Sequence, residues 1–182
     1  MKQNQFYKYI KIIILIIYLA NLNAMMHTPI EDEGNIKLTI GKKEWTYYEL
    51  DDGLIFGDIG KEYDIGDSIQ VEIHSRTIIG SNSKNTKKYG FTVQINGNEP
   101  IELKYKKNKS KLKNSDRPSW DYTKKGVWYL YLPVQDLMNL EITPIDRKHV
   151  FLRLATSKIK KKGKFKNVLQ TVNHQNKIEI KT

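Results

Sequence analysis

The sequence contains no cysteine among its 182 residues. A chain without cysteine cannot form disulfides, and it has no thiolate to act as a nucleophile or to bind zinc or an iron–sulfur cluster. Acylation of an N-terminal cysteine, which anchors bacterial lipoproteins, is excluded for the same reason. The folded domain must therefore owe its stability to packing.

Arginine is also scarce, since 4 arginines stand against 27 lysines. The planar guanidinium group best matches phosphate and carboxylate groups, so its scarcity weakens the case for a site specific to polyanions. Lysine, isoleucine and asparagine are abundant, which an AT-rich genome produces without selection for binding. No segment of ten or more residues shows a convincing helical period.

The N-terminus has the three parts of an export signal. The first eleven residues contain three lysines and no acidic residue, and a continuous apolar run follows from Ile12 to Ala20. Residues 21–24 contain two asparagines and end in the small Ala24, which is typical of the cleavage region of a secretory signal peptide. An uncleaved membrane anchor is the alternative, but a spanning helix needs about 20 apolar residues and this run is shorter.

We therefore expect residues 1–24 to be a cleaved signal peptide and residues 25–182 to form a single domain. The expected location is secreted or periplasmic. No linker is long enough to divide the mature chain, and no internal repeat is present.

The charge is uneven along the expected mature chain. Residues 25–75 contain four lysines and twelve acidic residues, whereas residues 76–182 contain 24 basic and eight acidic residues. A basic half of this kind can bind polyanions such as nucleic acid, acidic glycans or an anionic membrane. Because an exported protein has little access to cellular nucleic acid, we expect no nucleic-acid partner.

The mature chain shows the alternation and turn residues of a β protein. Ser68–Ser75 is the clearest half-buried strand, with Ile69, Val71 and Ile73 facing inward. Val127–Val134 is apolar on both faces, which is typical of a central strand. Further strands are expected at 35–40, 44–50, 89–96, 101–105, 140–145, 150–155, 167–172 and 177–181, and one helical turn is expected at 135–139.

These strands are joined by recognisable turns: residues 41–43 form a turn, and three hairpins are expected around residues 96–98, 146–148 and 173–176. Roughly nine to eleven short strands at regular spacing predict an all-β fold. We expect a single β-sandwich of antiparallel strands, jelly-roll or Greek-key-like.

An acidic, glycine-punctuated stretch from Asp51 to Asp67 suggests a cation site. Carboxylates separated by glycines can surround a hard ion such as Ca²⁺, although the spacing is not that of an EF-hand. The alternative is ordinary turn chemistry, in which Asp side chains satisfy their own backbone. If calcium binds as a cofactor, the expected ligands are Asp51, Asp52, Asp58 and Asp64.

An aromatic loop between Asp116 and Trp128 suggests a glycan platform. Trp120 and Tyr122 could stack on sugar rings, while Arg117 and Asp121 could hydrogen-bond the hydroxyl groups. The alternative is that Trp120 folds back and caps the open end of the sandwich. Trp128 lies inside an apolar strand and is expected in the core.

Two basic runs, Lys104–Lys113 and Lys158–Lys166, could contact an anionic surface. The alternative is a solvated, flexible basic loop, and residues 106–118 are expected to form such a loop. The candidate polyanion-binding residues are Lys106, Lys107, Lys109, Lys111, Lys113, Lys160, Lys161 and Lys162.

No catalytic motif is present, because the four histidines do not pair at metal-binding spacing and no Gly-x-Ser-x-Gly sequence occurs. We therefore expect a secreted, non-enzymatic binding module whose partner is an extracellular glycan or protein. The first alternative is a basic interaction protein or effector that docks on anionic surfaces, and the second is a small secreted hydrolase.

Overall fold

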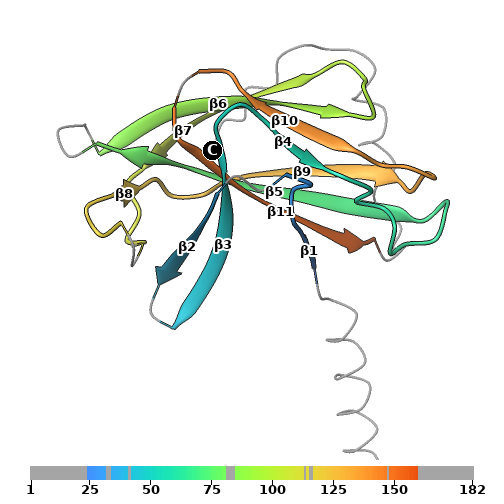
Figure 1. The fold of residues 1–182 in the computed structure, drawn as a ribbon, viewed down its shortest axis with the longest axis horizontal. Coiled ribbons are helices and arrows are strands. Elements are labelled where there is room, and N and C mark those ends of the chain that lie inside the picture. The colour runs from blue at the N-terminus through green and yellow to red at the C-terminus, as the bar shows by residue number, and fades with distance from the viewer. Residues whose placement is uncertain are drawn as a thin grey trace, which may run out of the picture.

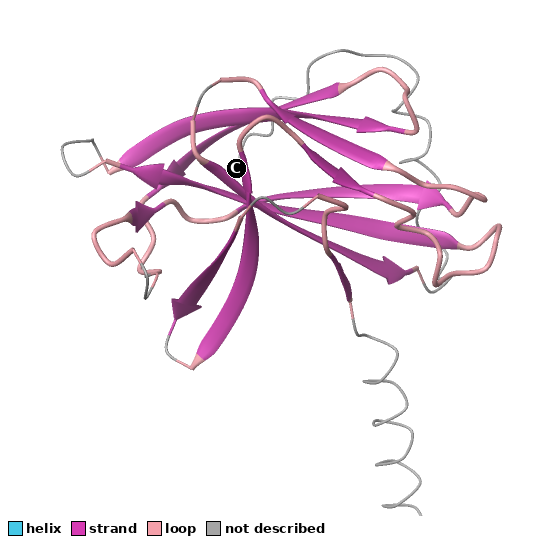
Figure 2. Ribbon diagram, viewed as in Figure 1, coloured by secondary structure: helices cyan, strands magenta, loops and turns pink. Residues whose placement is uncertain are grey.

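The computed structural model describes residues 24–31, 34–40, 42–80, 85–112, 114, 117–146 and 148–159. Within these ranges the chain forms eleven strands and no helix (Figure 2), so none of its described segments is a helix able to cross a membrane. Nearly all of the predicted signal peptide, residues 1–23, and the predicted hairpin at 167–181 lie outside the described residues. The strands are β1 (Met25–His27), β2 (Asn35–Ile40), β3 (Lys43–Leu50), β4 (Leu54–Phe56), β5 (Ser68–Ile79), β6 (Thr86–Ile95), β7 (Ile101–Asn108), β8 (Asp121–Tyr122), β9 (Gly126–Pro133), β10 (Leu140–Pro144) and β11 (Val150–Lys158).

The strands build two antiparallel sheets that face each other as the layers of a sandwich (Figure 1). Sheet A has seven strands in the order β2-β3-β11-β5-β8, with β1 beside β11 and β9 beside β5. Sheet B has four strands in the order β4-β10-β6-β7. The prediction of an all-β sandwich of short antiparallel strands is confirmed.

β5 and β11 form the centre of sheet A, and each is flanked by two shorter strands in succession. β11 pairs with β3 at residues 150–152 and with β1 at residues 154–156. β5 pairs with β9 at residues 68–75 and with β8 at residues 78–79. One end of sheet A therefore brings together the end of β3, the start of β11 and β8, and we call this the loop end.

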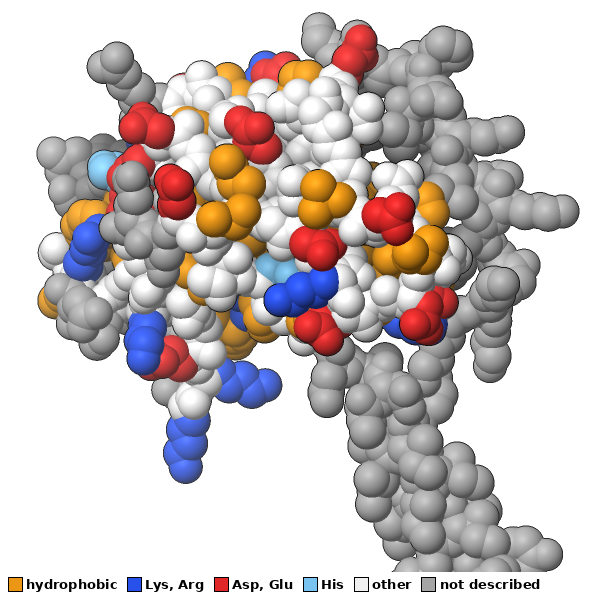
Figure 3. All heavy atoms as spheres, turned by 45° about the vertical axis from the view of Figure 1, so that its right-hand side comes forward, with side chains coloured by type: hydrophobic (Ala, Val, Ile, Leu, Met, Phe, Trp, Pro, Cys, Tyr) orange, Lys and Arg blue, Asp and Glu red, His pale blue; other side chains and the backbone are white. Residues whose placement is uncertain are grey.

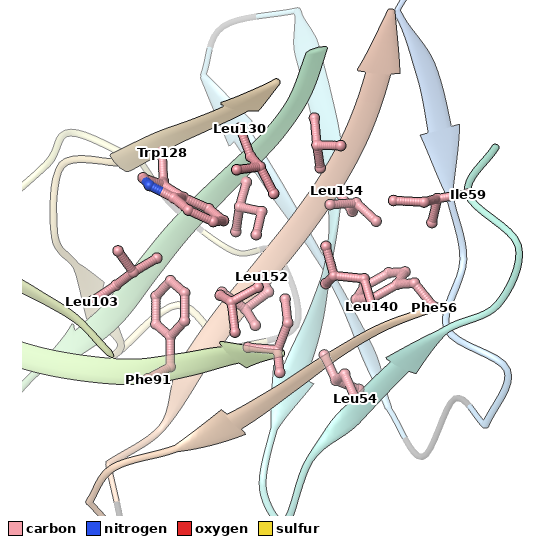
Figure 4. Packing of buried hydrophobic residues seen from close by; sticks show 14 of the residues in the cluster. Leu54, Phe56, Ile59, Phe91, Leu103, Trp128, Leu130, Leu140, Leu152 and Leu154 are labelled. Carbon is pink, nitrogen blue, oxygen red and sulfur yellow. The ribbon is translucent and has the colours of Figure 1, made fainter. Parts of the chain in front are cut away.

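The main core lies between the two sheets and follows from the alternation of the strands. Ile69, Val71 and Ile73 on β5 are fully buried, as predicted. Figure 4 shows Phe91 from β6 and Leu152 from β11 among the side chains that the two sheets direct into this space. Trp128 belongs to the same core, as predicted.

A second, smaller core lies at the loop end, where the β2–β3 hairpin projects from the sandwich (Figure 1). Phe151 belongs to it because neighbouring residues of β11 alternate between the two faces of sheet A. Its buried members are Ile36, Leu38, Tyr47, Leu112, Tyr122 and Phe151, and Trp45, Ile78 and Trp120 pack against them partly buried.

The β6–β7 hairpin forms at the predicted Asn-Gly turn. Asn96 and Gly97 both have positive φ, 48° and 74°, and Asn98 N–H donates to the carbonyl oxygen of Ile95 at 2.9 Å. Two consecutive positive φ angles define the turn that matches the twist of a two-stranded ribbon, and Asn and Gly tolerate them best. β2 and β3, expected as strands on either side of a turn, also pair with each other as an antiparallel hairpin.

Three predictions about the second half of the chain are wrong. β10 and β11 do not form a hairpin, since β10 lies in sheet B and β11 in sheet A. β9 is not central, because among the described residues it pairs only with β5, and Tyr129 is 48% exposed. The expected helical turn at residues 135–139 is not helical.

Candidate functional site

Trp120 lies at the loop end on top of the second core. Its ring centroid is 6.5 Å from that of Tyr122 and 6.4 Å from that of Phe151, and these two rings pack edge to face beneath it. The indole is partly buried, so one part is anchored and the remainder reaches the surface. The ring of His149, from the β10–β11 connection, lies 5.8 Å away.

Polar side chains extend from Trp120 across the loop end. The guanidinium carbon of Arg117 lies 4.3 Å from the centroid of the Trp120 ring, within the range of a cation–π contact. Arg117 Nη1 is 3.6 Å from Oε2 of Glu49, and Oε1 of Glu49 is 2.6 Å from Nδ1 of His149. Arg117, Glu49 and His149 are thus held in a defined arrangement around the indole.

An open pocket of about 350 Å³ adjoins this arrangement, and we call it the loop-end pocket. It is lined by Leu50, Asp51, Asp52, Lys148 and His149. The two strands that frame it meet where Val150 pairs with Leu50, so the β3–β4 and β10–β11 connections leave the sheet side by side. An aromatic ring next to carboxylate, ammonium and imidazole groups is an arrangement that can orient a polar ligand.

The structure separates the four residues predicted to form the glycan platform. Trp120 and Arg117 lie together beside the loop-end pocket. Tyr122 has no exposed surface, so its predicted role in stacking on a ligand is wrong, and it supports Trp120 from below. Asp121 is half-buried and binds Nζ of Lys109 at 2.6 Å.

The structure does not gather the four aspartates predicted to bind calcium. Asp51 and Asp52 line the loop-end pocket. Asp58 lies elsewhere, beside Asn139, and the backbone N–H of Asp58 donates to Oδ1 of Asn139 at 3.1 Å. Asp64 lies far along the sheet near Lys158, at the opposite end of β11. Within the described ranges, the one group of three metal-ligating side chains consists of Glu49, Asp51 and His149.

The basic residues of the first run lie on and just after an edge strand. Lys106 and Lys107 belong to β7, so the predicted loop from 106 onward is wrong at its start. Lys109 forms a bridge with Thr123, and Lys111 is exposed. Lys113 and the second run, Lys160, Lys161 and Lys162, lie outside the described residues.

Lysines face one another across β6 and β7. Lys88 pairs with Lys106 and Lys87 with Lys107, and like charges directly opposite each other destabilise a strand pair. Lysines on an edge strand also hinder pairing with a second sheet, which gives them a structural reason to be there. On the face shown in Figure 3, acidic, basic and apolar side chains are interspersed.

A second polar group lies on the outer face of sheet A, where the sequence indicates a solvated, outward-facing His74 beside Glu72. His74 hydrogen-bonds Glu72, and Tyr129 stands opposite Glu72 in the register of β5 and β9. Burial lowers the pKa of His74 below its usual 6.5, against the opposing effect of Glu72. The outward orientation of Glu72 and His74 was predictable from alternation, but the burial of His74 was not, because it depends on side chains of other strands.

No protein-family model matches the chain, and no curated protein was found that matches it in sequence. A solved structure of a family GH115 4-O-methyl-α-glucuronidase with specificity for decorated arabinogalactans aligns over 76% of this chain, at 16% identity and a TM-score of 0.43. This chain spans only 18% of that protein. A family 35 carbohydrate-binding module from Clostridium thermocellum aligns over 72% of this chain and 87% of its own, at 16% identity and a TM-score of 0.29.

Proposed function

We propose that the chain is an exported, non-enzymatic binding module that holds a glycan at the loop-end pocket. The observation that carries this proposal is the partly exposed Trp120 beside a pocket with two carboxylates, an ammonium group and an imidazole. The signal-like N-terminus supports export. The absence of a recognisable catalytic motif in the sequence supports a binding role.

The contacts around Trp120 favour a sugar as the ligand. The part of the indole that Arg117, Phe151 and Tyr122 leave uncovered offers an apolar surface to the C–H groups of a sugar ring. Phe151 and Tyr122 hold the indole in place. Asp52 and Lys148 can accept from and donate to the hydroxyl groups of the same sugar. Anchored aromatic groups lose little conformational freedom on binding, which favours affinity.

The test is a titration of the purified protein with a panel of soluble glycans, followed by tryptophan fluorescence and calorimetry. We expect saturable binding that changes little with salt and is lost in Trp120→Ala. Since Trp120 also packs on the second core, Asp52→Ala and Lys148→Ala provide two variants outside the core, each expected to weaken binding. Tyr129→Ala is the matched control, because it removes an exposed aromatic ring from the other part of sheet A.

Binding that survives Trp120→Ala, or that Tyr129→Ala abolishes instead, would place the glycan elsewhere. Failure of every glycan in the panel to bind would contradict the proposal for those sugars and favour a protein partner at the same end.

Docking on an anionic surface is the second candidate function, and the facing lysines of β6 and β7 favour it. The Lys88–Lys106 pair would be relieved of its repulsion by a bound polyanion. Binding to vesicles with anionic lipid should then fall steeply as salt rises, and Lys88→Gln/Lys106→Gln should reduce it. Binding that ignores salt or this double substitution would exclude the β6–β7 surface.

A further inference from the structure

Three side chains at the loop end bring one imidazole nitrogen and two carboxylate oxygens together. The ligating atoms of Glu49, Asp51 and His149 all lie within 4.8 Å of one another. Glu49 and Asp51 come from the end of β3 and the turn after it, and His149 comes directly before β11. The pairing of Leu50 with Val150 fixes the backbone between them, so the cluster is built by the register of the sheet.

The chemistry of this donor set points to a borderline transition metal. Imidazole and carboxylate ligands suit Zn²⁺, whereas Ca²⁺ takes six to eight oxygen ligands. Two Zn²⁺ bonds of the usual length at a tetrahedral angle place the ligand atoms about 3.3 Å apart. To bind Zn²⁺, the 2.6 Å between Oε1 of Glu49 and Nδ1 of His149 must widen a little, and any two ligand atoms farther apart than about 3.3 Å must move closer. The exposed side chains of Asp51 and His149 can accommodate both changes by rotation.

The surroundings of the cluster support a cation. Among the described residues in and beside the pocket, the carboxylates of Glu49, Asp51, Asp52 and Asp146 outnumber the cationic groups of Arg117 and Lys148 by two. Lys148 is already paired with Asp146. Arg117 approaches Oε2 of Glu49 and leaves Oε1 directed toward His149, in the way that polar neighbours orient a metal-binding carboxylate.

We propose that Glu49, Asp51 and His149 form a site for Zn²⁺ at the loop end. Three protein ligands leave a fourth tetrahedral position open toward the loop-end pocket. The site goes beyond the proposed glycan binding and does not depend on it, since the metal ligands are complete without a sugar. It also differs from the calcium site predicted from sequence, with which it shares only Asp51.

The test is a calorimetric titration of the purified, untagged protein with ZnCl₂ in the absence of any glycan. We expect one saturable site per chain, with affinity on the order of tenfold or more weaker in His149→Ala and in Asp51→Asn. Asp52→Asn is the matched control, because it removes the same charge from the same pocket without removing a proposed ligand. This control should change the affinity by less than about threefold. The three substituted side chains, those of Asp51, Asp52 and His149, are exposed, so the variants should fold, which thermal unfolding will check.

Three results would overturn the proposal. The first is no saturable binding of ZnCl₂ by the unaltered protein. The second is equal weakening by Asp51→Asn and Asp52→Asn, which would show general attraction to acidic groups in place of coordination. The third is tighter binding of CaCl₂ than of ZnCl₂, which would indicate an oxygen site. Saturable Zn²⁺ binding by an unaltered protein that binds no glycan would contradict only the proposed function.

Discussion

Replacing Phe151 with alanine tests whether the loop end is held by a packed core. Phe151 is fully buried and belongs to the second core, and its ring lies 5.7 Å from that of Tyr122 at 72° and 6.4 Å from that of Trp120. It faces away from the main core, in which Leu152 and Val150 on either side of it take part. The substitution therefore removes support from the loop end and leaves the main core intact.

The expected cost follows from burial and cavity formation. Phe→Ala substitutions at buried positions lower the free energy of unfolding by about 3–5 kcal/mol, which includes the lost contact with neighbouring rings. For a domain of this size each kcal/mol lowers the melting temperature by about 3–4 °C. We expect Phe151→Ala to melt about 9–20 °C below the unaltered protein.

Urea and thermal unfolding, followed by circular dichroism and tryptophan fluorescence, measure this difference. Leu137→Ala is the control, because it removes an apolar side chain that is 57% exposed and should change stability by no more than about 0.5 kcal/mol. The fluorescence of Trp120 should also report a more solvated ring. A loss of less than about 1 kcal/mol would refute the reasoning, since the second core would then not be a close-packed unit.

Two further predictions concern a glycine and a histidine in sheet A. An added Cβ at Gly126 would lie 2.7 Å from Oγ of Ser75, so Gly126→Ala should destabilise by about 1–3 kcal/mol in urea unfolding, whereas Gly34→Ala, with open space around it, should not. Burial lowers the folded-state pKa of His74, so as pH falls through about 6.5 the unfolded chain takes up a proton that the folded chain does not, and stability declines. His74→Gln should make the urea midpoint fall less steeply between pH 7.5 and pH 5. Some decline should remain, because burial also lowers the pKa of His27. An unchanged decline in His74→Gln would contradict the role assigned to His74.

The strands with clean alternation could be predicted from the sequence, but their partners could not always be. Residues 68–73 and 89–95 alternate because one face of each packs in the main core, and the structure confirms both. The turn at Asp146 marks where the chain changes direction, yet a turn does not say which sheet the next strand joins. Leu140 and Val150 bury their side chains in one core from opposite sheets, and each would look the same within a hairpin.

β9 was misjudged because tyrosine is a poor indicator of burial. Tyr129 and Tyr131 made its outer face look apolar, although a phenol ring can lie at the surface with its hydroxyl in water. Trp128 and Leu130 on the other face are buried as expected. The strand is therefore one-sided, which agrees with its position beside β5 alone among the described strands.

The candidate site could be predicted only in part, since it joins distant segments. Trp120 and Asp51 stood out in the sequence, but Glu49 and His149 lie 100 residues apart and meet only through the pairing of β3 with β11. A lone histidine and a lone glutamate at strand ends carry no signal of their own. Their contact is a property of register, which a single sequence does not specify.

The second core gives the proposed binding site on the loops at this end a rigid support. Surface connections are usually mobile, and a mobile site loses affinity to the entropy of ordering its side chains. Here Phe151 and Tyr122 fix Trp120, and Trp120 in turn lies against Arg117 and His149. The buried part of the loop end is thus ordered before any ligand arrives. If this is correct, Phe151→Ala should weaken glycan binding although Phe151 does not line the pocket, whereas it should affect Zn²⁺ less, because the metal ligands are held by the pairing of β3 with β11.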